Sequence, residues 1–165
     1  MLLLPQGKII RATRAHLNEI AEIIADNFDR AMPEHSPAVK NFCKSHSTAE
    51  QLREEFSWRE MYVYINSANV VLGTGALVNF GSAHKPKWCV SNLFVKVEYH
   101  GKGIGKLLLE NLFVQAQKKK AHELFVPSSR TAVAFYRKFG FATLPPIEQP
   151  ADDIALEITW MRKQM

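Results

Sequence analysis

The chain has 165 residues, 47% of them hydrophobic and 22% charged, a composition that fits one globular domain over residues 1–165. No apolar run approaches the roughly 20 residues of a membrane span, and the first eight residues do not resemble a secretory leader. The two cysteines fit no metal spacing. We therefore expect a cytoplasmic protein that binds neither membrane nor metal. The formal net charge of +5 favours an anionic partner, although a protein that is simply basic would carry the same charge.

The first half of the chain is expected to hold a strand, two helices and a hairpin. The elements expected there are a strand at 7–13, helices at 14–31 and 48–58, and hairpin strands at 61–65 and 70–80. The first helix carries apolar residues at helical spacing, namely Leu17, Ile20, Ile24 and Phe28. Residues 32–47 contain two prolines and no clear period, which predicts a loop with at most a short helical turn.

The second half is expected to alternate strands and helices. Its elements are a turn at 81–86, a strand at 87–97, a helix to about Lys120, a strand at 122–127, a helix at 129–140 and closing strands at 141–145 and 153–163. Gly140 suits a helix C-terminus, and the proline-rich stretch at 145–153 predicts a loop. This order of seven strands and four helices predicts an α/β (α+β) fold with a mixed, mostly antiparallel sheet and one parallel element at its centre.

The stretch HGKGIG at 100–105 joins an expected strand to an expected helix. It is not a P-loop, which needs glycine at position 100 and Ser or Thr at 107, and it is not the dinucleotide fingerprint, which needs glycine at 106. The first turn of a helix leaves N–H groups unpaired, and glycine lets the backbone approach a ligand closely. The stretch is therefore either an anion site, helped by Lys102 and Lys106, or a glycine-rich corner with ordinary surface lysines.

A second stretch, SRTAVAFYRKFGF at 129–141, favours the anion site. The two stretches together resemble the motifs Q/R-x-x-G-x-G/A and N-x-x-A-x-x-F-Y-x-K-x-G-F of the GCN5-related N-acetyltransferase (GNAT) superfamily. The resemblance is specific from about Lys87 to Phe141. His100 stands where Gln or Arg is usual and lacks the arginine fork, and Ser129 stands where Asn is usual and can replace one amide hydrogen bond.

The resemblance implies a GNAT-like sheet that is splayed between its two central parallel strands, with acetyl-CoA as co-substrate in the gap. In this family the glycine loop holds the pyrophosphate, and pantetheine lies along the central strand. An amide near Val95 would polarise the thioester carbonyl. The cofactor-binding residues implied are Leu93, Phe94, Val95, His100, Gly101, Lys102, Gly103, Ile104, Gly105, Lys106, Ser129, Phe135 and Tyr136.

The implied reaction is acetyl transfer to a primary amine of a small molecule, amino acid derivative or peptide, by direct attack in a ternary complex. Tyr136 matches the family's tyrosine that assists the departing thiolate. No residue stands out as the base: Asn92 cannot take a proton, and His84 and Glu60 are better interpreted as surface residues. Water relayed by backbone carbonyls is the default expectation.

The alternatives are a non-catalytic module that binds CoA or acyl-CoA, and a nucleic-acid-binding domain, which the scattered lysines disfavour. A metal site at His35, Cys43 and His46 is disfavoured because the spacing is irregular. The loops at 32–47 and 145–153 are expected to form walls of the acceptor pocket. Their acidic residues Glu34, Glu148, Asp152 and Asp153 are candidates to attract an ammonium group. The acceptor has no readable motif, and pairing of the late strands between chains would permit a homodimer.

Overall fold

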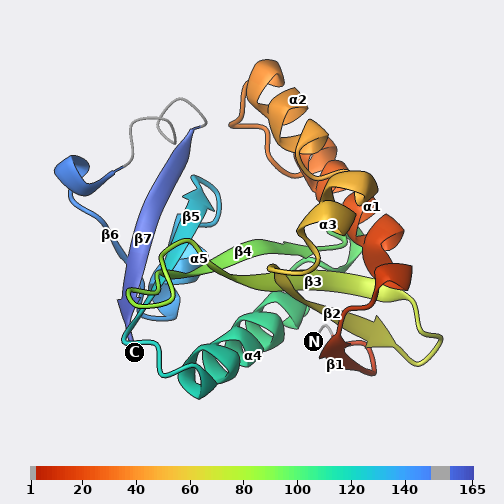
Figure 1. The fold of residues 1–165 in the computed structure, drawn as a ribbon. Helices are drawn as coiled ribbons and strands as arrows, with labels where there is room; N and C mark the ends of the chain where they lie inside the picture. The colour runs from red at the N-terminus through yellow and green to blue at the C-terminus, as the bar shows by residue number, and fades with distance from the viewer. Residues whose placement is uncertain (1–2, 150–156) are drawn as a thin grey trace.

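The computed structural model describes residues 3–149 and 157–165. Its strands form one sheet in the order β1-β2-β3-β4-β5-β7-β6 (Figure 1). They are β1 (Gly7–Arg11), β2 (Glu60–Asn66), β3 (Val71–Asn79), β4 (Trp88–Val95), β5 (Glu123–Ser129), β6 (Ala142–Thr143) and β7 (Ile158–Gln164). Neighbouring strands are antiparallel except β4 and β5, so the predicted mixed sheet with a central parallel pair is confirmed.

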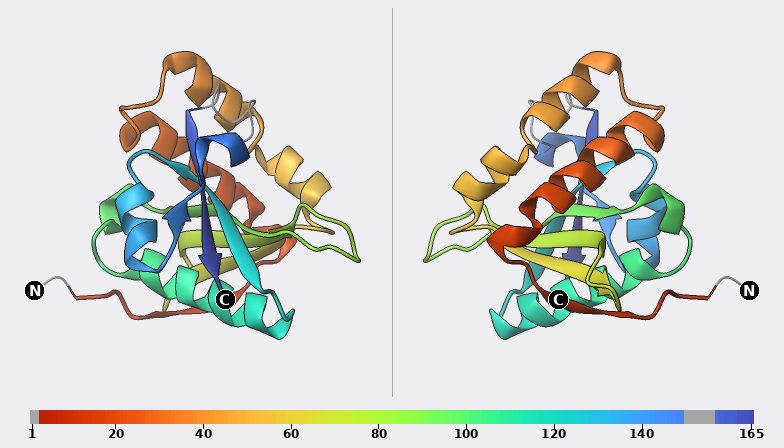
Figure 2. Two further views of the ribbon diagram at one scale, coloured as in Figure 1. Left: turned by 90° about the vertical axis from the view of Figure 1, so that its left-hand side faces the viewer. Right: turned by 90° about the vertical axis from the view of Figure 1, so that its right-hand side faces the viewer.

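Helices cover both faces of the sheet (Figures 1 and 2). They are α1 (Leu17–Arg30), α2 (Pro37–Ser45), α3 (Ala49–Glu55), α4 (Ile104–Lys118) and α5 (Val133–Lys138). Side chains of β2 alternate between the faces: Met61 and Val63 pack with α1 and α3, whereas Tyr62 packs with α4 and α5. In the described part of the chain, no helix combines the length and apolarity needed to cross a membrane.

The sequence prediction is wrong for α2, because the interpretation of residues 32–47 as a loop treated proline as a helix breaker. Pro37 occupies the first turn of α2, where its missing N–H is not needed. The hydroxyl of Ser36 accepts a hydrogen bond from the Val39 N–H at 3.3 Å and so caps the helix. Val39 is 7% exposed and anchors this nine-residue helix to the rest of the molecule.

Helix α5 also begins later than predicted. Ser129 was placed at the start of a helix, but it is the last residue of β5 and pairs with Ile158 of β7, so α5 starts only at Val133. Gly140 ends α5 as predicted, with a φ of 91°, and the Phe141 N–H reaches back to the Tyr136 carbonyl at 3.2 Å. The first residues of the predicted final strand, 153–156, lie outside the described residues.

The sheet splays between β4 and β5. These strands share one aligned pair, Cys89 with Phe125, after which β5 stays paired with β7 along its whole length. β4 is bulged where its pairing with β3 shifts between Thr74 and Ala76, and Asn92 in the bulge has a φ of 49°. The bulge turns the end of β4 away from β5 and leaves one of its edges unpaired.

Candidate active site

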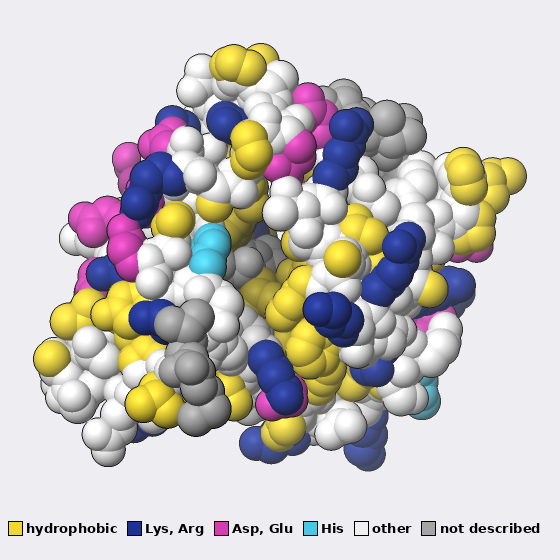
Figure 3. All heavy atoms as spheres, turned by 180° about the vertical axis from the view of Figure 1, so that it is seen from behind, with side chains coloured by type: hydrophobic (Ala, Val, Ile, Leu, Met, Phe, Trp, Pro, Cys, Tyr) yellow, Lys and Arg dark blue, Asp and Glu magenta, His cyan; other side chains and the backbone are white. Residues whose placement is uncertain are grey.

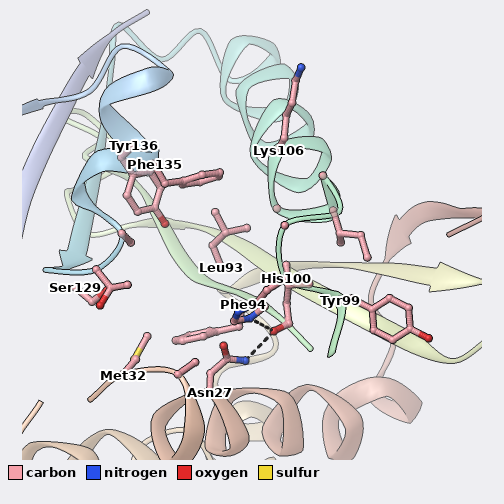
Figure 4. Close-up of a pocket in the computed structure, with 18 residues that line it drawn as sticks. Asn27, Met32, Leu93, Phe94, Tyr99, His100, Lys106, Ser129, Phe135 and Tyr136 are labelled. Atoms are coloured by element: carbon pink, nitrogen blue, oxygen red, sulfur yellow. Dashed lines mark hydrogen bonds between the residues drawn. The ribbon is translucent and has the colours of Figure 1, made fainter. Parts of the chain in front are cut away.

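A cavity of about 460 Å³ lies where β4 and β5 diverge (Figure 4). The residues predicted to contact a cofactor line this cavity with one exception; those that line it are Leu93, Phe94, Val95, His100, Gly101, Gly103, Ile104, Gly105, Lys106, Ser129, Phe135 and Tyr136. The exception is Lys102, whose ammonium group lies 4.9 Å from the centre of the Tyr99 ring. The sheet topology therefore brings the glycine loop and the α5 motif, which are separate in the sequence, to one site.

The glycine loop presents main-chain donors to this cavity. Gly101 and Gly103 have φ values of 75° and 93°, which residues with a side chain rarely adopt. Within the described residues, the N–H groups from Gly101 to Lys106 have no hydrogen-bond partner, and the Leu107 N–H makes the first bond of α4, to the Gly103 carbonyl at 3.2 Å. This ring of donors at the positive end of a fifteen-residue helix is suited to bind an anion.

The charge around the cavity adds to this potential. Lys106 has a 61% exposed side chain and lies 4.0 Å from Glu110, too far to be neutralised by a close ion pair. Figure 3 shows the molecule from behind, where the surface is hollowed; hydrophobic side chains line the hollow and Lys and Arg side chains stand around it. A ligand with an apolar arm and a phosphorylated end fits this distribution of side chains.

Two side chains converge on the carbonyl oxygen of Val95, the last residue of β4. His100 Nε2 and Asn27 Nδ2 each lie 2.9 Å from this oxygen. Because a carbonyl oxygen only accepts, His100 carries its hydrogen on Nε2 and the ring is held against the end of β4. The two bonds fill both lone pairs of the Val95 carbonyl and tie α1 to the strand end.

Helix α1 and the two residues after it contribute wall residues that the sequence did not predict, namely Asn27, Ala31 and Met32. Asn27 is 4% exposed and its Nδ2 also donates to the Ile23 carbonyl at 2.9 Å. Its Oδ1 has no partner within the described residues, and Figure 4 shows the side chain directed towards the cavity. The available signal was a single amide on the apolar face of the helix, beside Phe28 and one turn after Ile23 and Ile24.

Tyr136 places its hydroxyl in the cavity wall (Figure 4). The ring is 6% exposed and makes edge contacts with Phe135 and Phe141, with centroids 5.3 and 5.4 Å apart. Burial raises the pKa of the Tyr136 hydroxyl well above its ordinary value of 10.0, so this phenol stays protonated at physiological pH. The hydroxyl has no hydrogen-bond partner within the described residues and is free to donate to a ligand.

A smaller cavity of about 130 Å³ adjoins the first and shares part of its wall. The shared residues are Met32, Leu93, Phe94, Ser129, Ala132 and Tyr136. His35, from the loop before α2, and Cys43, from α2, line only the smaller cavity. Residues 32–47 thus contribute Met32, His35 and Cys43 to the wall of this cavity, and their role as a wall of the acceptor pocket stays a prediction.

The other side chains considered from the sequence lie elsewhere. Glu148 is 3.9 Å from Arg162, Glu60 pairs with Lys119 at 2.8 Å, and His84 is exposed in the turn after β3. Asp152 and Asp153 lie outside the described residues. Glu34 remains close to the smaller cavity, because its Oε1 lies 3.8 Å from His35 Nε2. Of the acidic candidates that the structure describes, Glu34 is thus the one that lies beside a side chain of the smaller cavity.

The three side chains that the sequence disfavours as a metal site do not come together in the structure. Cys43 and His35 line the smaller cavity, but His46 stacks on Phe42 at the end of α2, with ring centroids 4.0 Å apart. Among residues 3–149 and 157–165, no cluster of three or more His, Cys, Asp or Glu side chains could hold a metal ion.

Comparisons with known proteins agree with this geometry. The fold matches PaiA N-acetyltransferase from Thermoplasma acidophilum, solved with coenzyme A, at 19% identity and a TM-score of 0.78, over 97% of this chain and 99% of that one. It matches a GCN5-related N-acetyltransferase from Rhodopseudomonas palustris at 15% identity and a TM-score of 0.76, over 100% and 99% of the two chains. It also matches N-acetylglutamate synthase from Neisseria gonorrhoeae, solved with coenzyme A and N-acetyl-glutamate, at 19% identity and a TM-score of 0.72, over 96% of this chain and 35% of that one.

The sequence itself gives the family. A comparison with curated protein sequences found no match. Residues 29–164 match the family profile described as "Acetyltransferase (GNAT) domain". This range includes the glycine loop and the motif on α5. The chain therefore belongs to the GCN5-related N-acetyltransferase family.

Proposed function

We propose that this protein is an acetyl-CoA-dependent N-acetyltransferase that transfers the acetyl group to a primary amine of a small molecule, amino acid derivative or peptide. One observation carries the proposal: the unpaired N–H groups at the start of α4 and the free hydroxyl of Tyr136 face the same largely apolar cavity. Such a cavity suits a ligand with a diphosphate at one end and a reactive thioester at the other.

The residues proposed to bind the cofactor contact different chemical groups of it. The amides from Gly101 to Lys106 would hold the diphosphate, with Lys106 adding positive charge. The pantetheine arm of the cofactor contains amides and would pair with the unpaired edge of β4 at Leu93 to Val95, in the way an additional strand pairs with a sheet. Ser129 and Phe135 would line the opposite side. Asn27 Oδ1 offers an additional acceptor in the same wall.

Acetyl transfer to an amine has two proton requirements. An amine with a pKa of ~10.4 is mostly protonated at pH 7, and its neutral form costs about 4–5 kcal/mol, so a base must accept a proton. The leaving thiolate, with a pKa of ~8.5, must be stabilised as the C–S bond breaks. Tyr136 meets the second requirement by donating a hydrogen bond to the thiolate. Burial raises the pKa of its phenol, so the hydroxyl keeps its proton and remains a hydrogen-bond donor.

Calorimetry and a thiol-release assay test the proposal. We expect the protein to bind acetyl-CoA and CoA, and to release thiol when a primary amine is added from a panel containing a free amino acid, a linear polyamine, an arylalkylamine and a short peptide. CoA binding without thiol release across the panel would indicate a non-catalytic CoA-binding module instead. Absence of affinity for any CoA species would refute both functions.

A further inference from the structure

His35 is a buried titratable side chain that the proposed function leaves unused. It lies in the loop between α1 and α2, is 6% exposed, and packs its ring 6.2 Å from the ring of Phe28. It lines the smaller cavity, whose wall also contains Phe94 and Tyr136. His35 and Tyr136 therefore line the same cavity.

Glu157, the residue immediately before β7, fixes the orientation of this imidazole. Its Oε2 lies 3.0 Å from His35 Nδ1 and accepts the Ser36 N–H at 3.2 Å. Partial desolvation raises the pKa of Glu157, but the hydrogen bonds from His35 and Ser36 outweigh it and hold that pKa below the ordinary value of 4.5. A carboxylate only accepts hydrogen bonds, so Nδ1 carries the hydrogen and Nε2 of the neutral ring has a free lone pair.

The surroundings of Nε2 suit a group that gains a proton. Nε2 has no hydrogen-bond partner within the described residues, and the carboxylate oxygen Oε1 of Glu34 lies 3.8 Å away. This oxygen is buried and also lacks a hydrogen-bond partner within the described residues. Burial raises the pKa of Glu34, but hydrogen bonds involving Thr131 bring it below its ordinary value, so the carboxylate is ionised. An imidazolium at His35 would therefore face two carboxylates, Glu34 and Glu157.

Other groups near the smaller cavity are poorer bases. Burial and the charge of Glu157 both raise the pKa of the Cys43 thiol, which keeps it protonated. Asn92 cannot accept a proton on its amide. The Val95 carbonyl, a natural relay for a water molecule, already accepts hydrogen bonds from Asn27 and His100. These contacts leave His35 as the basic side chain with a free lone pair in this wall.

We propose that His35 is the general base of the acetyl transfer, positioned by Glu157; the inference rests on the proposed function. The ammonium form of the acceptor first loses one proton to solvent, and the neutral nitrogen then attacks the thioester carbonyl carbon and forms the C–N bond. As the C–S bond breaks, the proton on that nitrogen passes to His35 Nε2, across the smaller cavity or through one water held there. The sulfur leaves as a thiolate that accepts a hydrogen bond from Tyr136, then takes a proton from solvent, and His35 returns its proton to solvent.

The variant His35→Asn separates this role from a structural one. The asparagine amide can still donate to Glu157 from the position of Nδ1, but it has no group at the position of Nε2. We expect kcat to fall about 100-fold or more, with the dissociation constant of CoA and the melting temperature close to wild type. His84→Asn, in the exposed turn, should behave as wild type. Wild-type kcat in His35→Asn would overturn the proposal and assign His35 a structural role.

Two further measurements separate failure of this inference from failure of the proposed function. Wild-type thiol release from acetyl-CoA is measured first, and its absence across the amine panel would refute the function. The tautomer of His35 is then read by two-bond ¹H–¹⁵N correlation at neutral pH, which needs no acceptor. A hydrogen on Nδ1 with a bare Nε2 is expected; a hydrogen on Nε2 would overturn the inference, whatever the activity.

Discussion

The variant Tyr136→Phe removes a hydroxyl that the protein itself does not use. The hydroxyl makes no hydrogen bond within the described residues, and the ring contacts with Phe135 and Phe141 do not involve it. Removing a desolvated, unpaired polar atom should leave the free energy of unfolding unchanged or raise it by up to about 1 kcal/mol. Any loss of activity can therefore be attributed to the ligand.

The size of that loss follows from the charge that Tyr136 is proposed to meet. A hydrogen bond to an ionised group contributes about 1.5–3 kcal/mol, and the thiolate exists only as the C–S bond breaks. Because the interaction is made in the transition state, kcat and kcat/KM should both fall about 10- to 150-fold in a thiol-release assay. The affinity for CoA in its thiol form should change little in calorimetry.

Tyr64→Phe is the matched control. The Tyr64 hydroxyl donates to the Pro5 carbonyl, and its ring is 2% exposed and lines neither cavity. This variant should lose about 1 kcal/mol of stability in urea denaturation and keep its activity, the reverse of Tyr136→Phe. Equal activity of Tyr136→Phe and wild type would refute the assignment of Tyr136 to the leaving sulfur.

Three other predictions concern the backbone and the pH dependence of stability. Gly103→Ala should lower the free energy of unfolding by about 1–2 kcal/mol, because residues with a side chain rarely adopt its φ of 93°. Gly105→Ala should not destabilise the helix, but it should weaken CoA binding, because its Cβ would stand 3.7 Å from Phe135 and Val95 in the cavity wall. Asn92→Val should cost about 1–2 kcal/mol in urea denaturation because Asn92 has a φ of 49°, and Asn92→Gly should cost nothing. Folding lowers the pKa of Glu157, so its ionised carboxylate stabilises the folded state above the unfolded pKa of 4.5, and this stabilisation is lost as the pH falls through the lower folded pKa. Glu157→Gln should lack this step in acid denaturation. An unchanged step would contradict the pairing with His35.

The sequence is sufficient to predict those structural features that depend on residues close together in the chain. The glycine loop, the amphipathic α1 and the end of α5 at Gly140 each depend on residues within a few positions, and each is in the structure near its predicted place. The error at α2 has the same origin, since Ser36 and Pro37 form a helix start that resembles a loop when position within the helix is ignored.

The sequence could not predict the contacts that complete the site. Asn27 meets the Val95 carbonyl across 68 positions of the chain, and His35 meets Glu157 across 122. Neither contact leaves a period or a motif, because only the sheet topology brings the partners together. In the sequence, His35 stands out only as a disfavoured metal ligand, and no pattern singles out Glu157.

The two cavities place different demands on the sequence. Binding of a diphosphate by main-chain N–H groups requires a backbone conformation at Gly101 and Gly103 and leaves most side chains free, so a short motif is enough to specify it. The proposed proton transfer to His35 requires one particular side chain on the loop before α2, in an orientation set by Glu157. Substitutions in that loop can therefore change the acceptor without altering the glycine loop, which is why the cofactor is readable from the sequence and the acceptor must be found by assay.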